Sequence, residues 1–416
     1  MQLRMAAEQE VFFHVLISLA ILLFAAKIFA EIFNKVRLPV VLGELLAGII
    51  VGPFALGSIP IFDGKPLVIL NETVLQIGEI SGIVILFIAG LSITPKEFLR
   101  GGAASFTVGA CGVAVPFFVG YYAFTLFGLG GLQSVLVATA LTATSIAISV
   151  RVLTELGRMQ TKEAKLILGA AIVDDILAIA VLSVVTTMVQ SGNMTPNVLE
   201  IVFLILKVLG IFAVILLGAI LLIPKILHAE RLWKSRGSVE GIVTASFFGA
   251  SGIAAAVGLS PIVGAFAVGM AVASTKLIRR VEEYVDKLEI IFAPLFFAII
   301  GAQVNLTGFN LDVLFLSLVV IGVAIATKLV GCGLPAIIFL KSKSKAMKAG
   351  IGMISRGEVG LIVAGIGVTS GVLSSNIYTT VIIMVVVTTL ITPIWLKKSY
   401  CKEEMEAEEG GTSSPS

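Results

Sequence analysis

Two adjacent carboxylates stand inside a long apolar stretch of this sequence. The stretch reads AAIVDDILAIAVL over residues 170–182, and the two acids are Asp174 and Asp175. If this stretch is a helix, neighbouring positions point about 100° apart, so the two carboxylates cannot face the same partner. One of them can pair with a buried cation while the other faces a water-filled cavity. In such a cavity a carboxylate binds either a proton or a hard metal cation.

Lys328, in VAIATKLVGCGLP, is the clearest candidate for the buried cation. An ionisable group at bilayer depth costs at least about 2.5–3.5 kcal/mol on insertion scales, so it needs a partner or access to water. A plain ion pair between Asp174 and Lys328 that holds two helices together is the simpler interpretation. That alternative leaves Asp175 without a role.

The stretch TALTATSIAIS, residues 139–149, is typical of an interrupted helix. Thr142, Thr144 and Ser145 could supply hydroxyl oxygens and backbone carbonyls released from helical hydrogen bonds. Such oxygens suit a bound monovalent cation. Ordinary packing of small residues between helices is an equally good interpretation of Thr144 and Ser145.

A second interrupted stretch, GMISRGEVGLI, has Gly357 between Arg356 and Glu358. Two helices broken at one depth and crossing each other would bring opposed helix ends beside Asp175. The broken ends would offer carbonyls to a cation, and Arg356 and Glu358 would balance the helix dipoles. A structural ion pair between Arg356 and Glu358 is the more favoured role for these two residues.

The composition shows what must position these residues. Of 416 residues, 58% are hydrophobic and 13% are charged, whereas soluble domains have about 45–50% and about 25%. We therefore predict an all-α polytopic membrane protein of about thirteen crossings. The predicted crossings are 11–33, 39–57, 76–95, 103–127, 132–152, 164–189, 198–224, 238–258, 261–275, 287–305, 312–340, 346–370 and 376–396.

Basic residues predict the orientation of these crossings. Most of the 29 Lys and Arg residues lie in loops that follow odd-numbered crossings, as in 151–165, 225–236, 276–287 and 341–348. The opposite side has only Arg4 and Lys65. Because Lys and Arg collect in cytoplasmic loops, the N-terminus is expected outside and the C-terminus in the cytoplasm. The net charge of +3 needs no nucleic-acid partner to explain it.

The sequence also repeats itself weakly. LLAGIIVGPFALG in the second crossing is similar to GAFAVGMAVAS in the ninth, and SGIVILFIAGLSIT in the third to FAPLFFAIIGAQVN in the tenth. Equivalent crossings are seven apart, an odd number, so the second copy is inverted in the membrane. Inverted repeats whose broken helices meet near the midplane are typical of secondary transporters.

Several long motifs together resemble the cation/proton antiporter superfamily, most closely its NapA-like sodium/proton branch. They are VLGELLAGIIVGP, TATSIAISVRVLTELG, LGAAIVDDILAIAVL, GLSPIVGAFAVGM, IATKLVGCG and SRGEVGLIVA. The resemblance implies a homodimer in the cell membrane with a transmembrane antiporter domain over residues 1–398. It implies a core of about 103–189 and 312–396, and a dimerisation part of about 11–95 and 198–305. The acidic and Gly/Ser-rich tail 399–416 is expected to be disordered.

The resemblance also implies a site and an activity. The ion-binding carboxylate falls on Asp175, its lysine-paired neighbour on Asp174 and the lysine on Lys328. The unwound positions fall on Thr144 with Ser145, and on residues 356–358. The implied function is exchange of Na⁺ or Li⁺ for H⁺ by alternating access, without a cofactor. Aspartate at 174 further implies electrogenic exchange of two protons for one Na⁺, and a K⁺/H⁺ antiporter is the alternative.

Two other classes fit the residues less well. An intramembrane aspartyl protease needs two carboxylates that converge and share a proton, whereas the side-by-side Asp174 and Asp175 diverge. A cation channel needs rings of acids or carbonyls along a pore, and no such repetition is present in the sequence. A transporter rather than an enzyme is therefore expected.

Overall fold

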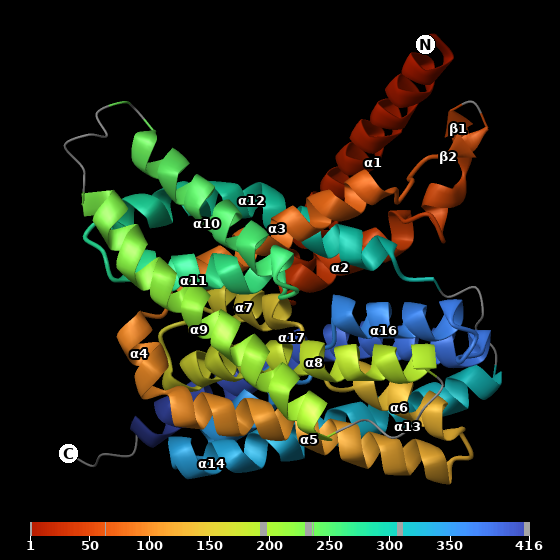
Figure 1. Cartoon of the computed structure of the whole chain (residues 1–416). Coiled ribbons are helices and arrows are strands. Elements are labelled where there is room, and N and C mark those ends of the chain that lie inside the picture. Colours follow the sequence, from red (N-terminus) through yellow and green to blue (C-terminus); the bar gives the residue numbers. More distant parts are fainter. Residues whose placement is uncertain are drawn as a thin grey trace. The chain divides into compact units, whose positions relative to one another are not determined.

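The computed structural model describes residues 2–62, 64–191, 198–228, 235, 237–305 and 311–411, and nearly all of these residues are helical (Figure 1). The chain divides into two compact units, each drawn from both halves of the sequence. The first comprises Met1–Glu97 and Lys207–Gly308, and the second comprises Phe98–Leu206 and Phe309–Ser416.

The first unit consists of helices packed closely through small residues. Its elements are α1 (Gln2–Lys35), α2 (Val40–Val51), the short η1 (Leu56–Ser58), the hairpin β1 (Pro60–Phe62) and β2 (Lys65–Pro66), α3 (Glu72–Leu91), α10 (Ser238–Ala256), α11 (Pro261–Ala273) and α12 (Ile278–Ala302). A Cβ at Gly48 of α2 would overlap the carbonyl oxygen of Ala298 in α12. Backbones therefore touch where membrane helices lack large side chains. Helix α4 (Pro95–Arg100) and helix α9 (Val198–His228) run across the boundary between the units.

The second unit contains every predicted site residue. Its elements are α5 (Gly102–Leu126), α6 (Gly131–Ala140), α7 (Ile146–Glu155), α8 (Lys162–Ser191), α13 (Leu311–Lys328), the π-helical segment η3 (Leu329–Gly333), α14 (Leu334–Leu340), α15 (Lys343–Gly352), α16 (Glu358–Thr369) and α17 (Ser375–Gly411). Buried apolar side chains of α5, α6, α13, α16 and α17 form its core, including Phe124, Leu136, Val320, Val363 and Met384.

Within the described part of the chain, nine helices are long and apolar enough to cross a membrane. Shorter apolar helices include α6, α11 and residues Val359–Val368. These features confirm the all-α, multi-pass fold class. The number of thirteen crossings stays a prediction.

Both predicted helix interruptions are confirmed. Helix α6 ends at Ala140 and α7 begins at Ile146, so residues 141–145 are not helical. Helix α15 ends at Gly352 and α16 begins at Glu358, which leaves 353–357 non-helical. Each interruption opens four backbone groups at each helix end to other partners.

A third irregularity was not predicted. Residues 312–340 were predicted as one crossing, and within it η3 follows Lys328 directly. Pro335 has no N–H and its ring crowds the carbonyl of Gly331, so the regular helical hydrogen bond between them is lost. Gly331 and Gly333 tolerate the widened turn that results.

The tail also differs from its prediction. Residues 399–416 were expected to be disordered, yet α17 continues to Gly411. Lys, Glu, Met and Ala dominate residues 402–409, and all four are strong helix formers. The high helix propensity of these residues therefore explains why α17 continues through the acidic segment and ends only at the glycines 410 and 411. Residues 412–416 lie outside the described part of the chain.

Candidate functional site

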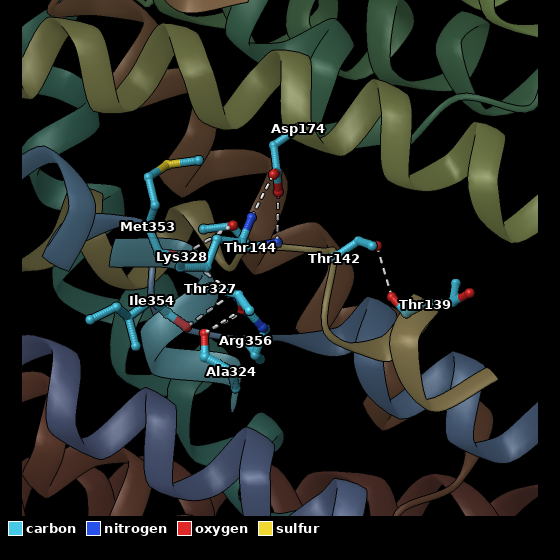
Figure 2. A network of polar contacts seen from close by, with 10 residues as sticks. All are labelled: Thr139, Thr142, Thr144, Asp174, Ala324, Thr327, Lys328, Met353, Ile354 and Arg356. Atoms are coloured by element: carbon cyan, nitrogen blue, oxygen red, sulfur yellow. Dashed lines mark hydrogen bonds and ion pairs between the residues drawn. The ribbon is translucent and has the colours of Figure 1, made fainter. Parts of the chain in front are cut away.

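Asp174 and Lys328 meet inside the second unit, where both side chains are fully buried. Lys328 Nζ donates to Asp174 Oδ1 at 2.6 Å. The second oxygen, Asp174 Oδ2, accepts the backbone N–H of Thr144 at 2.9 Å, as Figure 2 shows. A buried ion pair is tolerated only when its geometry is close and the remaining lone pairs are bonded. Each oxygen of Asp174 meets that requirement.

Helix α5 presses directly against this ion pair. A Cβ on Gly112 would lie 2.7 Å from Cys332 Sγ, 3.3 Å from Asp174 Oδ1 and 3.6 Å from Lys328 Nζ. One turn earlier, a Cβ on Gly109 would lie 2.8 Å from the Val173 Cβ. Two glycines therefore let α5 close over the pair. Sequence reasoning missed both, because their role depends on which helix packs there.

The two unwound segments bind each other. Ser145 N–H donates to the Ser355 carbonyl at 2.9 Å, and Ser355 Oγ donates to the Ser145 carbonyl at 3.0 Å. Thr144 Oγ1 donates to the Met353 carbonyl at 3.3 Å, and Ser149 Oγ donates to the Gly352 carbonyl. Direct hydrogen bonds thus join the two broken helices where they were predicted to cross.

Arg356 lies fully buried within the second unwound segment. Its Nη1 donates to the carbonyls of Met353 at 3.3 Å and Ile354 at 3.2 Å, and its Nη2 to that of Ala324 at 3.2 Å. The Met353 and Ile354 carbonyls follow the C-terminal end of α15, where the helix dipole is negative. The Arg356 guanidinium therefore lies against that helix end, where its charge can balance the dipole, which is one of the two roles considered for it. The side chain of Glu358 lies outside the described part of the structure, so its pairing with Arg356 stays a prediction.

The hydroxyls of the first unwound segment differ in what they bind. Thr142 Oγ1 donates to the Thr139 carbonyl at 2.7 Å and so caps the end of α6. Ser145 Oγ is buried and has no hydrogen-bond partner among the described residues. Buried polar atoms are nearly always bonded, so the Ser145 hydroxyl is available to water or to a bound ion.

Asp175 follows Asp174 on α8 but is only half-buried, in contrast to the fully buried Asp174. The difference follows from the helical rotation of about 100° between neighbours. The structure thus brings Asp174, Lys328 and Thr144 into contact and gives Asp175 a more accessible position on the same helix turn.

A cavity of about 530 Å³ is lined by residues of α5, α6 and α8, among them Leu177, one turn beyond Asp174. Its lining is apolar and aromatic, with Phe117, Phe118, Tyr121 and Tyr122 among the larger side chains. None of the described residues that line it is a carboxylate. Its mainly apolar lining makes this cavity poorly suited to a bound cation.

Comparisons with known proteins agree on one family. A model of the sodium/hydrogen exchanger transmembrane family matches residues 18–398. The high-affinity Na⁺/H⁺ antiporter NhaS3 of Synechocystis is 34% identical, with 96% of this chain and 93% of that protein aligned. The Na⁺/H⁺-K⁺ antiporter GerN of Bacillus cereus is 33% identical, with 94% and 97% aligned. A Na⁺/H⁺ antiporter of Enterococcus hirae is 34% identical, with 91% and 96% aligned.

One solved structure has the same fold over its full length. The sodium proton antiporter MjNhaP1 of Methanocaldococcus jannaschii superposes with a TM-score of 0.70 at 18% sequence identity, and all of both chains is covered.

Proposed function

The chain belongs to the sodium/hydrogen exchanger family, and on that premise we propose that Asp175 is the carboxylate at which Na⁺ and protons compete. Na⁺/H⁺ antiport is the activity that the family and the relatives' names support. The protein is a multi-pass membrane transporter and not an enzyme. The Na⁺ and H⁺ that it exchanges are its substrates.

One observation carries the assignment to Asp175. Both oxygens of Asp174 already have donors, Lys328 Nζ and the Thr144 N–H. Asp175, less buried on the same helix turn, is the carboxylate better placed for ions arriving from water. Na⁺ is a hard cation that favours oxygen ligands, and the buried Ser145 hydroxyl is a second candidate ligand from the unwound segment.

Competition at one carboxylate explains obligatory exchange. A proton on Asp175 removes the charge that holds Na⁺, and bound Na⁺ disfavours the proton, so the two ions occupy the site in turn. We propose that the second unit carries this site and that the first unit dimerises with a second copy. Movement of one unit against the other would expose the site to each side alternately, as in other repeat-built transporters.

Lys328 is proposed to carry a second proton. A buried lysine releases its proton readily when its partner changes state, and Asp174 is that partner. Two protons would then exchange for one Na⁺, and the cycle would be electrogenic.

K⁺ is a second candidate substrate, because GerN is named for K⁺ as well as for Na⁺. Carbonyl and hydroxyl oxygens of the unwound segments suit either ion, and the size of the cage decides between them. Measuring proton flux with Na⁺, Li⁺ or K⁺ as the only cation would rank the three ions by how well the protein transports them.

The central test is Asp175→Asn in proteoliposomes loaded with a pH-sensitive dye. Asparagine keeps the size and hydrogen bonding of aspartate but cannot alternate between charged and neutral forms. We expect Na⁺-driven proton movement to be lost while the protein still folds and elutes as the wild type does. Substantial exchange by a well-folded Asp175→Asn protein would overturn the assignment.

A further inference from the structure

Tyr400 of α17 lies buried among cationic groups from other elements, with 3% of its surface exposed. Lys348 Nζ sits 4.2 Å from the centroid of its ring. The guanidinium carbon of Arg158 lies 5.8 Å from the same centroid. The Tyr400 hydroxyl lies 3.5 Å from Thr161 Oγ1. One aromatic side chain therefore contacts three polar residues, two of them cations.

These contacts join three separate parts of the second unit. Tyr400 belongs to α17, and Lys348 to α15. Arg158 and Thr161 form the turn between α7 and α8, where Thr161 Oγ1 donates to the Arg158 carbonyl at 2.9 Å and accepts the Ala164 N–H at 3.3 Å. Tyr400 is thus one residue that contacts α15 and the α7–α8 turn from α17.

The ring is well suited to this position because Lys348 is fully buried. A cation over an aromatic face is attracted by the ring quadrupole, and the attraction grows when water is excluded. Loss of the ring would leave a buried ammonium with weaker stabilisation. A shift of α15 that brings Lys348 closer to water would offset that loss.

The elements that Tyr400 joins are those that build the candidate ion site. From Lys348, α15 rises about 7 Å to the Met353 carbonyl, which accepts from Thr144. From Thr161, α8 rises about 20 Å to Asp174. A shift of α15 relative to α8 would therefore alter the contacts between the two unwound segments.

We propose that Tyr400 is a positioning residue for ion exchange, which sets the geometry of the ion site by contacting Lys348 in α15 and Arg158 in the turn before α8. The proposal rests on the Na⁺/H⁺ exchange proposed above. It extends that function to a residue of α17 that touches neither ion.

Na⁺ dependence of exchange in proteoliposomes tests this role. Tyr400→Leu removes the ring, and Tyr400→Phe keeps the ring but loses the hydroxyl contact with Thr161. Tyr378→Leu is the matched control, because it makes the same change near the other end of α17. We expect the Na⁺ KM to rise about three- to tenfold in Tyr400→Leu, in line with one lost cation–π contact. It should stay within about twofold of wild type in the other two variants.

A purely structural role gives a different result. It would lower the melting temperature and the maximal rate of Tyr400→Leu but leave the Na⁺ KM of the folded protein at the wild-type value, and that outcome overturns the proposal. If Tyr400→Leu does not fold, Arg158→Gln takes its place, because Arg158 is only half-buried. Its Na⁺ KM should rise about threefold, beyond the twofold range of the control variants, and a KM within that range in a folded Arg158→Gln protein likewise overturns the proposal.

A double-mutant cycle that combines Tyr400→Leu with Lys348→Met shows whether the two residues affect the Na⁺ KM through each other or independently. If Tyr400 acts through Lys348, the double variant should have the same Na⁺ KM as the more affected single variant. Multiplying effects would show that the two residues act independently and would overturn the proposal. Absence of Na⁺/H⁺ exchange by wild-type protein is a distinct outcome, since it would overturn the proposed function itself.

Discussion

The buried ion pair of Asp174 and Lys328 is stabilised by its close geometry, although both charges are removed from water. Removing two charges from water is costly, and the attraction between them repays that cost only with close geometry. The 2.6 Å contact and the Thr144 N–H provide it. Because breaking such a pair leaves one charge uncompensated, each partner depends on the other.

Lys328→Gln should therefore destabilise the protein by several kcal/mol, about the 3–5 kcal/mol typical of a broken buried pair. Adding Asp174→Asn removes the uncompensated charge, so the double variant should be more heat-stable than Lys328→Gln alone. Thermal unfolding in detergent, monitored by fluorescence, gives the melting temperatures that show which of the two variants is more stable. Equal melting temperatures for the two variants would contradict a pair that matters for stability.

Residue types and their depth in apolar runs were sufficient to predict that Lys328 has a carboxylate partner. They also predicted the oxygen-rich character of 142–145. They did not predict Gly109, Gly112 or the Thr144 N–H as parts of the site, because a glycine and a backbone amide have no side-chain signal. The packing of α5 on α8 and η3 reveals the two glycines, and the hydrogen bond to Asp174 Oδ2 reveals the Thr144 N–H.

The two broken helices form one structural piece at the scale of elements. Their hydrogen bonds connect 144–145 to 353–355, so neither segment can move without the other. Sequence analysis located both breaks, since polar residues and glycine interrupt apolar runs there. It did not locate η3, because proline and glycine in a long apolar run are also compatible with a simple kink.

Gly357→Ala tests how closely the segments approach. Its Cβ would lie 2.8 Å from the Ser145 Cβ, so we expect a loss of about 1–3 kcal/mol of stability from overpacking. Gly365→Ala in α16 is the control, because a Cβ there meets no atom within 4 Å. Adding Ser145→Gly to Gly357→Ala should restore the melting temperature. The nearest atom of residue 145 to the new Cβ at position 357 would then be its Cα, at an ordinary contact distance of 3.5 Å. A melting temperature of Gly357→Ala equal to that of Gly365→Ala would show that the segments are looser than described.

The whole molecule is divided into two units, each built from both halves of the sequence. Sequence analysis predicted the all-helical class from composition and run length, and relatives and a solved structure support the same fold. Exact helix ends were less predictable, as α17 shows. They depend on local propensity and on caps that hydropathy does not record.

Electrogenicity is tested on the intact transporter. If two protons exchange for one Na⁺, a potential of 100 mV biases each cycle by about 2.3 kcal/mol, roughly a fifty-fold shift in the equilibrium gradient ratio. The Na⁺ gradient at which flux reverses should therefore move with the potential set by K⁺ and valinomycin in liposomes. A reversal point that does not move would mean one-for-one exchange, and Lys328 would then be only the partner of Asp174.

Orientation is the second prediction at this scale. The basic loops predict a cytoplasmic C-terminus, so a fluorescent protein fused after Ser416 should fluoresce. With Cys111, Cys332 and Cys401 replaced, a single cysteine placed at 190–197 should react with an impermeant reagent added outside. Labelling only after the cells are permeabilised would contradict the predicted orientation and indicate the opposite one.

The separation of Asp174 from Lys328 by 154 residues along the chain also has a consequence for biosynthesis. At about 5–20 residues per second, translation needs roughly 8–30 s to reach the lysine after the aspartate has been made. Throughout that interval Asp174 of α8 lacks its Lys328 partner. The hydrogen bond from Ser355 to Ser145 spans 210 residues and forms later still. The ion site is therefore completed late in synthesis, and a nascent chain stalled before residue 328 would lack both Lys328 and the second unwound segment.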